Sequence, residues 1–322
     1  MTAGNGDRPT APRSGWSEPV TRMAGASFGT RLAAAIRSSG TPLCMGIDPH
    51  PGMVPALFGN STEPGHPNTI RAISDFTMAC LAAAKGRVAA IKPQAAFFEA
   101  QGPDGMRVLA ELGRSAVDAG MLVIMDAKRN DIGSTNAAYA EAWIGHDAPF
   151  PSDALTVNAF LGLDTLEPLL ARADAVGAGL FVLTRTSNPG AGDLQDLDVG
   201  GKPLFHRLAE QLAPLATARC DNEGHSSLGI VAGATWPDEA RALRAILPSA
   251  PFLVPGFGAQ GGAAADALAG LTRDGDGWQN GLINSTRGLI FPKAAHDAGD
   301  IASWRSAIDE AITASRAALA AV

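Results

Sequence analysis

The sequence has 322 residues and a formal net charge of −7, from 25 Lys and Arg against 32 Asp and Glu. Because 46% of the residues are apolar and 18% are charged, we expect a globular protein with a large buried core. An acidic chain lacks the positive surface that nucleic-acid binding requires, so we exclude that class, although a local basic site for a small phosphorylated ligand stays possible.

The first part of the chain differs in composition from the rest. Residues 1–25 are rich in Gly, Pro, Ser and Thr and contain no apolar stretch typical of a secretory signal, so we predict a disordered tail. No segment approaches the roughly 20 apolar residues of a membrane span. We therefore expect no membrane partner and a cytoplasmic location, with residues 26–322 forming one domain.

Short apolar runs recur along that domain, each followed by a turn and a helix-like stretch. Their nearly continuous apolar character is typical of parallel strands that are covered on both faces. The eight predicted strands are residues 43–48, 88–92, 122–126, 154–158, 179–184, 228–233, 251–256 and 281–286.

The segments between the runs carry helical patterns. Residues 71–85 and 104–120 place apolar side chains three and four positions apart, and Gly120 stands where a helix-terminating glycine belongs. Residues 190–227 are the most irregular part and are predicted as an insertion that contains a helix over 203–219.

Eight strand–helix alternations indicate an α/β fold of the closed (β/α)8 barrel type, a TIM barrel. The alternative is an open doubly wound sheet, which usually carries a GxGxxG turn after its first strand. Residues 49–55 read PHPGMVP and do not match that turn. The three cysteines show no paired spacing, so we predict buried thiols instead of disulfides or a zinc site.

In such a barrel the carboxyl ends of the strands and the loops after them build the active site. The predicted strand ends carry polar side chains: Asp48, Lys92, Asp126, Lys128, Asn158, Thr186, Ser187, Thr235 and Arg287.

The most informative of these segments is MDAKRNDIGST, residues 125–135. Asp126 and Lys128 are two positions apart, so on an extended chain both point to the same face, and Asp131 follows in the loop. Together with Lys92 they form a set with no net charge. The set is either an ion-pair network that closes the barrel or a catalytic cluster. Its position at strand ends favours chemistry, because buried charge networks are weak stabilisers.

A second informative feature is the pairing of PGFGAQGG (255–262) with NSTRG (284–288). The loops after the seventh and eighth strands are the usual phosphate site of this barrel. Glycines let backbone N–H groups approach an anion, and Arg287 can bind a phosphate through two hydrogen bonds. The plainer interpretation of the glycines alone is a tight turn.

These segments together resemble the orotidine 5′-phosphate decarboxylase family, most closely its longer bacterial branch. The resemblance rests on AAIKPQAAFFE (89–99), DAKRNDIGST (126–135), VPGFGAQGG (254–262) and NSTRG (284–288), and it covers roughly residues 26–315 in the same order. The DxKxxD pattern alone is shared with metal-dependent phosphosugar enzymes of the same fold, whereas the whole series is specific.

The resemblance implies decarboxylation of orotidine 5′-phosphate to UMP, the last step of de novo pyrimidine synthesis, without cofactor or metal. The family's alternating Lys-Asp-Lys-Asp catalytic array corresponds to Lys92, Asp126, Lys128 and Asp131, with Lys128 as the proton donor. It also implies a homodimer in which Asp131 and Thr135 complete the neighbouring site. The implied substrate contacts are Asp48 and Thr135 with the ribose, Ser187 with the pyrimidine, and Gln260 and Arg287 with the phosphate.

The sequence departs from the family pattern near Ala232, and the resemblance gives no role to the acidic loop 192–198. A metal-dependent phosphosugar enzyme would be expected to carry Glu where Lys92 stands. A Schiff-base aldolase needs a lysine of lowered pKa, which Asp126 and Asp131 would oppose. A catalytically inactive barrel would not be expected to keep the whole array. His50 has no second histidine at metal-binding spacing and is interpreted as a loop residue.

Overall fold

The computed structural model describes residues 25–258, 263–275 and 277–322. Eight parallel strands close into a barrel, in which each strand pairs with the next along the chain and β10 pairs with β1. This confirms the predicted TIM barrel and excludes the open sheet. The barrel strands are β1 (Leu43–Ile47), β2 (Ala90–Pro93), β3 (Leu122–Arg129), β4 (Ala154–Val157), β5 (Gly179–Arg185), β6 (Leu228–Ala232), β7 (Phe252–Val254) and β10 (Gly281–Ser285).

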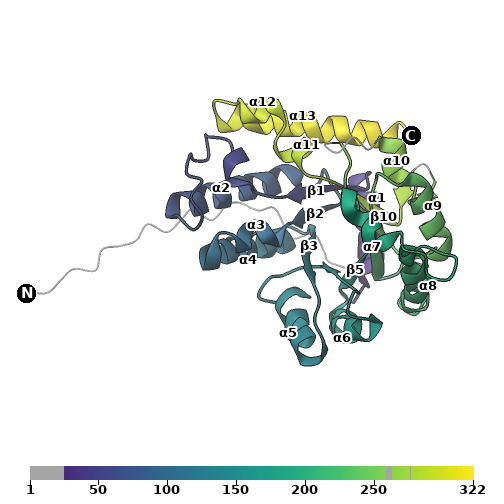
Figure 1. Ribbon diagram of the computed structural model, residues 1–322. Helices are drawn as coiled ribbons and strands as arrows, with labels where there is room; N and C mark the ends of the chain where they lie inside the picture. The colour runs from purple at the N-terminus through teal and green to yellow at the C-terminus, as the bar shows by residue number, and fades with distance from the viewer. Residues whose placement is uncertain (1–24, 259–262, 276) are drawn as a thin grey trace, which may run out of the picture.

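Helices surround this barrel, and Figure 1 shows them as an outer ring around the strands. Their α-helical members are α1 (Phe28–Ser39), α2 (Pro67–Ala84), α3 (Ala95–Glu99), α4 (Gly102–Asp118), α5 (Gly133–Trp143), α6 (Glu167–Val176), α7 (Gly192–Gln195), α8 (Leu204–Thr217), α9 (Pro237–Ile246), α10 (Ala264–Leu268), α11 (Arg287–Ile290), α12 (Lys293–His296) and α13 (Ile301–Ala320). Short 3₁₀ helices are η1 (Pro51–Met53), η2 (Leu163–Leu166) and η3 (Pro189–Ala191). None of the helices in the described residues has the length and apolar character needed to cross a membrane.

Local sequence signals explain several element boundaries. Pro103 lies in the first turn of α4, where its missing N–H costs nothing. Gly120 has φ of 77° just after that helix, a left-handed conformation that glycine adopts without strain. Between residues 190 and 227 the structure contains α7 and α8, and α8 matches the predicted helix closely.

A pair of short strands was not predicted from the sequence. The strands β8 (Thr272–Asp274) and β9 (Gly277–Gln279) pair antiparallel as a hairpin outside the barrel. Each strand has only three residues. β8 is intermediate to exposed and β9 buries only the polar Gln279, so neither carries a run of buried apolar residues by which it could be recognised.

The barrel interior is closed at the amino-terminal ends of the strands. Phe28 and Leu32 of α1 belong to the same buried cluster as Phe181 and Val231 of the strands, and the rings of Phe28 and Phe181 meet edge to face at 5.8 Å. Cys44 of β1 lies in this cluster and is fully buried. Cys80 is also fully buried, whereas Cys220 is only half-buried, and all three are free thiols.

Candidate active site

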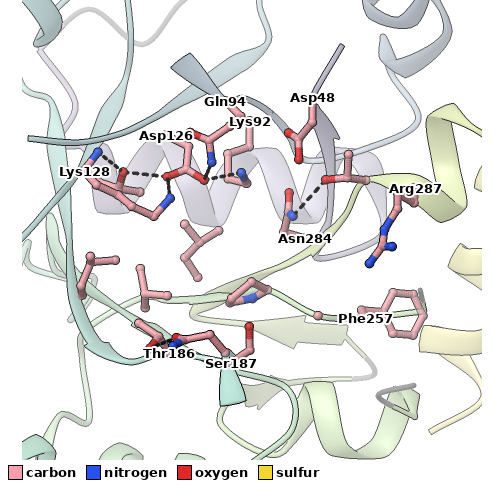
Figure 2. Close-up of a pocket in the computed structure, with 18 of the residues that line it drawn as sticks. Asp48, Lys92, Gln94, Asp126, Lys128, Thr186, Ser187, Phe257, Asn284 and Arg287 are labelled. Carbon is pink, nitrogen blue, oxygen red and sulfur yellow. Dashed lines mark hydrogen bonds and ion pairs between the residues drawn. The ribbon is translucent and has the colours of Figure 1, made fainter. Parts of the chain in front are cut away.

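A cavity of about 790 Å³ opens at the carboxyl ends of the strands. Its volume lies within the range of small-molecule sites. Polar side chains predicted from the sequence lie in its wall, and Figure 2 shows them around one space: Asp48, Lys92, Asp126, Lys128, Thr186, Ser187 and Arg287. Asn158 and Thr235 do not line it.

Asp126, in β3, is the centre of the charged cluster. Its Oδ2 lies 2.5 Å from Lys92 Nζ and its Oδ1 lies 2.6 Å from Lys128 Nζ. Thr156 Oγ1 donates a hydrogen bond to Oδ1 at 2.9 Å, and Gln94 Nε2 donates to Oδ2 at 3.0 Å. Both carboxylate oxygens therefore carry two donors each, which fixes the carboxylate in one orientation (Figure 2).

The charges in this cluster stabilise one another. Burial by itself would raise the pKa of Asp126, but the Lys92 and Lys128 ammonium groups outweigh it and hold that pKa well below its usual range. Burial by itself would lower the pKa of Lys92, but Asp126 and Asp48 raise it above its usual range. Asp126 is therefore a carboxylate and Lys92 an ammonium group at neutral pH.

Lys128 reaches this cluster from an irregular part of β3. Its φ is 49°, and the pairing of β3 with β4 shifts register between Met125 and Arg129. Such a bulge redirects a side chain, so the contact between Lys128 and Asp126 does not arise from the extended chain that the sequence argument assumed. The Lys128 backbone N–H donates to Thr156 Oγ1 at 3.0 Å, and 45% of its side chain stays exposed.

Asp48 follows β1 on another wall of the cavity. Its Oδ1 is buried and accepts no hydrogen bond within the described residues, and the same is true of Asn284 Oδ1. Burial raises the pKa of Asp48, a rise that Lys92 opposes. Buried acceptors normally have partners. Two such acceptors in a cavity wall suit a ligand that donates hydrogen bonds, such as one with hydroxyl groups.

The opposite rim carries a positive charge. Arg287 begins α11, and within the described part of the chain it has no ion-pair partner. Figure 2 shows its guanidinium group extending into the cavity between Asn284 and Phe257. Gly256 and Gly258 of the glycine-rich loop both have left-handed φ values. Gln260, the other predicted phosphate contact, lies outside the described residues.

Asp131 and Thr135 are not brought to this cavity. Asp131 lies between β3 and α5, where its carboxylate accepts a hydrogen bond from the Ile132 backbone at 2.7 Å. Thr135 is exposed in the first turn of α5. Neither lines the cavity of its own chain.

The sequence argument did not single out several cavity residues, which are Gln94, Thr156, Gln195, Asn284 and Thr286. Gln94 is two positions beyond Lys92, so the alternation used for Asp126 and Lys128 would have found it. Thr156 lies within β4, one residue before its end, whereas the argument considered only the last residue of each predicted strand and the residues that follow it. Gln195 lies in the acidic loop that had no role.

No group of three or more His, Cys, Asp or Glu side chains in the described ranges is placed to hold a metal ion. His50 lines the cavity, and its ring packs against Phe97 with centroids 4.5 Å apart.

The fold and the cavity define an enzyme of the TIM-barrel class, with a fixed cluster of opposite charges at its mouth. Residues 41–294 match the model of the orotidine 5′-phosphate decarboxylase / HUMPS family. The chain belongs to this family.

Similar proteins support the decarboxylase branch of the family. The orotidine 5′-phosphate decarboxylase of Rhodopirellula baltica is 42% identical over 290 residues, which cover 88% of this chain and 95% of that protein. A candidate orotidine 5′-phosphate decarboxylase of Streptomyces avermitilis has a crystal structure with a TM-score of 0.74, 37% identity, and coverage of 94% and 100%. The OMP decarboxylase of Leishmania donovani has a TM-score of 0.66 at 33% identity, with coverage of 91% and 99%.

Proposed function

We propose that the chain decarboxylates orotidine 5′-phosphate to UMP, the last step of de novo pyrimidine nucleotide synthesis. The observation that carries the proposal is the Lys92–Asp126–Lys128 cluster in a cavity of nucleotide size, in a chain about 40% identical to decarboxylases over most of its length.

In this reaction the bond between C6 and the carboxylate breaks, CO2 leaves, and the electron pair stays on C6. The resulting carbanion lies in the plane of the ring, so the ring π system does not delocalise it. Its stabilisation must come from charge that is fixed before the reaction. The Lys128 ammonium group supplies that charge and then donates the proton that replaces CO2. Asp126 holds Lys128 in place through the 2.6 Å contact, and a solvent proton restores the ammonium group.

The remaining walls suit the rest of the nucleotide. The free acceptors of Asp48 and Asn284 suit ribose hydroxyl groups. Ser187 is assigned to the pyrimidine edge, and Arg287 with Gln260 to the phosphate. Because the phosphate is remote from C6, its binding energy serves to orient the base and close the site. No step of this mechanism uses a cofactor or a metal.

We also propose a homodimer, in which Asp131 and Thr135 complete the site of the partner. The support is that both residues lie outside their own cavity. Large apolar side chains nearby are exposed, namely Ile132 (62%), Phe160 (74%) and Leu161 (50%). Exposed apolar groups gathered around a polar contact suit a protein interface. A biosynthetic enzyme of this kind would act in the cytoplasm.

The direct test is the loss of orotidine 5′-phosphate absorbance on addition of the purified protein, with and without EDTA. We expect the same rate in both cases, because the proposed chemistry needs only fixed charges. A rate that falls with EDTA and returns only with Mg²⁺ would place the chain with the metal-dependent enzymes of the family.

The shared site can be tested by mixing two inactive variants, Lys128→Ala and Asp131→Ala. A mixed dimer contains one intact site, built from Lys128 of one chain and Asp131 of the other. Random subunit exchange should therefore restore up to about one quarter of the wild-type activity. No recovery, with exchange confirmed by mass spectrometry, would show that Asp131 acts within its own chain.

A further inference from the structure

The acidic loop 192–198 forms part of the cavity wall. Residues 192–195 fold into α7, and Asp196 is its carboxyl-terminal cap. Gln195 of this helix lines the cavity together with Thr186 and Ser187, which follow β5. The loop therefore returns to the end of the strand from which it started.

Hydrogen bonds join the two ends of this loop. The Thr186 backbone N–H donates to Gln195 Oε1 at 3.0 Å, and Gln195 Nε2 donates to Thr186 Oγ1 at 2.8 Å. One side-chain amide thus holds both the backbone and the hydroxyl group of the residue next to Ser187. Two hydrogen bonds fix the orientation of Thr186 as well as its distance from Gln195.

Arg185 adds an ion pair beneath the same loop. Its side chain is only 2% exposed, and its Nη1 lies 2.8 Å from Asp196 Oδ1. On its other edge, Nε and Nη2 donate to the two carboxylate oxygens of Glu239 in α9, at 2.5 and 3.2 Å. The guanidinium group packs over the rings of Trp236 and Phe205, at 4.6 and 5.0 Å. The arginine is therefore held rigidly, and only its Asp196 contact reaches the loop.

Ser187 is confined from the opposite side by Gly233, which follows β6. A Cβ atom on Gly233 would lie 3.0 Å from Ser187 Cβ and 3.1 Å from its Cα. A side chain at residue 233 would crowd this approach, so Ser187 lies close against the end of β6, while the loop holds its neighbour Thr186 at the end of β5.

We propose that Arg185, Gln195 and Asp196 form a brace whose task is to position Ser187 on the pyrimidine base. The inference rests on the proposed function, because that function places the base against Ser187. These three are positioning residues: they set which nucleobase contact Ser187 makes, while the charged cluster around Asp126 carries out the chemistry.

A purely structural role for the Arg185–Asp196 ion pair would lead to a different expectation, namely an effect on stability and none on the contact of Ser187 with the base. Asp196 is 49% exposed, and pairs with an exposed partner contribute little to stability. Replacing Arg185 would leave Glu239 and Asp196 without their cation and would endanger folding, so the experiment alters Asp196 instead. Asp193 offers a matched control, because it is an exposed carboxylate in the first turn of the same helix.

The experiment measures kcat/KM for orotidine 5′-phosphate, and the affinities for UMP and for ribose 5-phosphate, in Asp196→Asn and Asp193→Asn. We expect Asp196→Asn to weaken kcat/KM and UMP binding about tenfold, a coupling typical of residues in one network. Ribose 5-phosphate has no base to reach Ser187, so its affinity should not change. Asp193→Asn should behave as wild type in all three measurements.

The decisive step repeats Asp196→Asn in a Ser187→Ala background. If the brace acts through Ser187, adding Asp196→Asn to Ser187→Ala should lower kcat/KM hardly any further. Three results would each overturn the brace. They are an equal fall in kcat/KM from Asp196→Asn in the Ser187→Ala background, an equal loss of affinity for ribose 5-phosphate, and an Asp196→Asn variant that behaves like the wild type. An inactive wild-type protein would instead overturn the proposed function, so the two failures are distinguishable.

Discussion

Two buried carboxylates, one at each end of the barrel, are built in different ways. At the carboxyl end, Asp126 binds two lysines, and one of them, Lys128, keeps nearly half of its side chain exposed. At the amino end, Asp153 precedes β4 and is 1% exposed. It accepts hydrogen bonds from the Arg31 guanidinium group, from His146 Nε2 at 2.8 Å and from the Val123 backbone at 2.8 Å.

Both carboxylates have a lowered pKa, but their surroundings differ. Those of Asp153 suit a role in stability, and those of Asp126 suit a role in function. Burial by itself would raise the pKa of Asp153, but the His146 hydrogen bond and the Arg31 charge outweigh it. All these partners come from the chain and tie α1 to the barrel. Near Asp126, by contrast, Asp48 and Asn284 keep acceptors free. The Asp153 cluster is completed by the protein alone, whereas the wall around Asp126 offers free acceptors that suit a ligand.

The largest expected effect is that of Lys128→Ala at the mouth. Loss of both the fixed charge and the proposed proton donor should lower kcat at least about 10⁴-fold. The melting temperature should change little, because Asp126 keeps Lys92. Single-turnover kinetics and thermal melting measure the two effects, and an activity within tenfold of wild type would contradict the proposed proton donor.

The counterpart at the base is Asp153→Asn. Removing the charge from a buried pair should cost about 3–5 kcal/mol of unfolding free energy, while kcat should be unchanged wherever the variant is folded. Urea unfolding and kinetics below the melting transition check this pair of outcomes. A fully stable variant with reduced kcat would reverse the comparison between the two ends.

Within the mouth, Arg287→Ala tests which part of the ligand the rim binds. It should cost about 2–5 kcal/mol in kcat/KM for the phosphorylated substrate, because a bidentate contact to a desolvated anion is lost. The phosphate-free nucleoside should react as slowly with the variant as with the wild type. Equal losses for both substrates would remove Arg287 from the phosphate site.

The smallest expected effect is a difference in how the two ends of the barrel make stability depend on pH. Because the folded pKa of Asp48 is raised, its ionisation destabilises the fold, and stability falls as pH rises from about the unfolded pKa of 3.9 through the folded pKa. Asp153 has the opposite sign: its contribution is present above about pH 3.9 and is lost as pH falls through the lowered folded pKa.

Asp48→Asn should therefore raise the unfolding free energy at pH 7, and this gain should disappear near pH 3. Asp153→Asn should show its largest loss at pH 7. Denaturant titrations across that range measure both slopes. Parallel slopes for the two variants would mean that the two ends do not differ electrostatically.

Much of the fold was predictable, because parallel barrel strands are apolar on both faces and stand out in the sequence. Residues 43–48 and 281–286 match β1 and β10 to within a residue. The β8–β9 hairpin was not, since Thr272–Asp274 has no buried face to reveal it.

Of the candidate site, the sequence predicted mainly the charged residues. Lys92, Asp126 and Lys128 are conspicuous because charged residues rarely end apolar strands. The bulge at Lys128 leaves no such mark, since its φ of 49° depends on pairing with β4. The link between Arg185 and Asp196 was equally hidden, because a contact between a strand end and a returning helix depends on the length of the intervening loop.

The seam between β1 and β10 joins the first and the last strand of the barrel, with Cys44 beside Asn284 and Met45 beside Ser285. A Cβ atom on Gly46 would overlap Thr286 Oγ1, so a bare glycine lets this last strand settle beside the first. Asp48 and Asn284, with their free acceptors, meet only across this seam. A nascent chain therefore cannot bring these two acceptors together until its last barrel strand has left the ribosome, so a ligand that needs both would report that the barrel has closed.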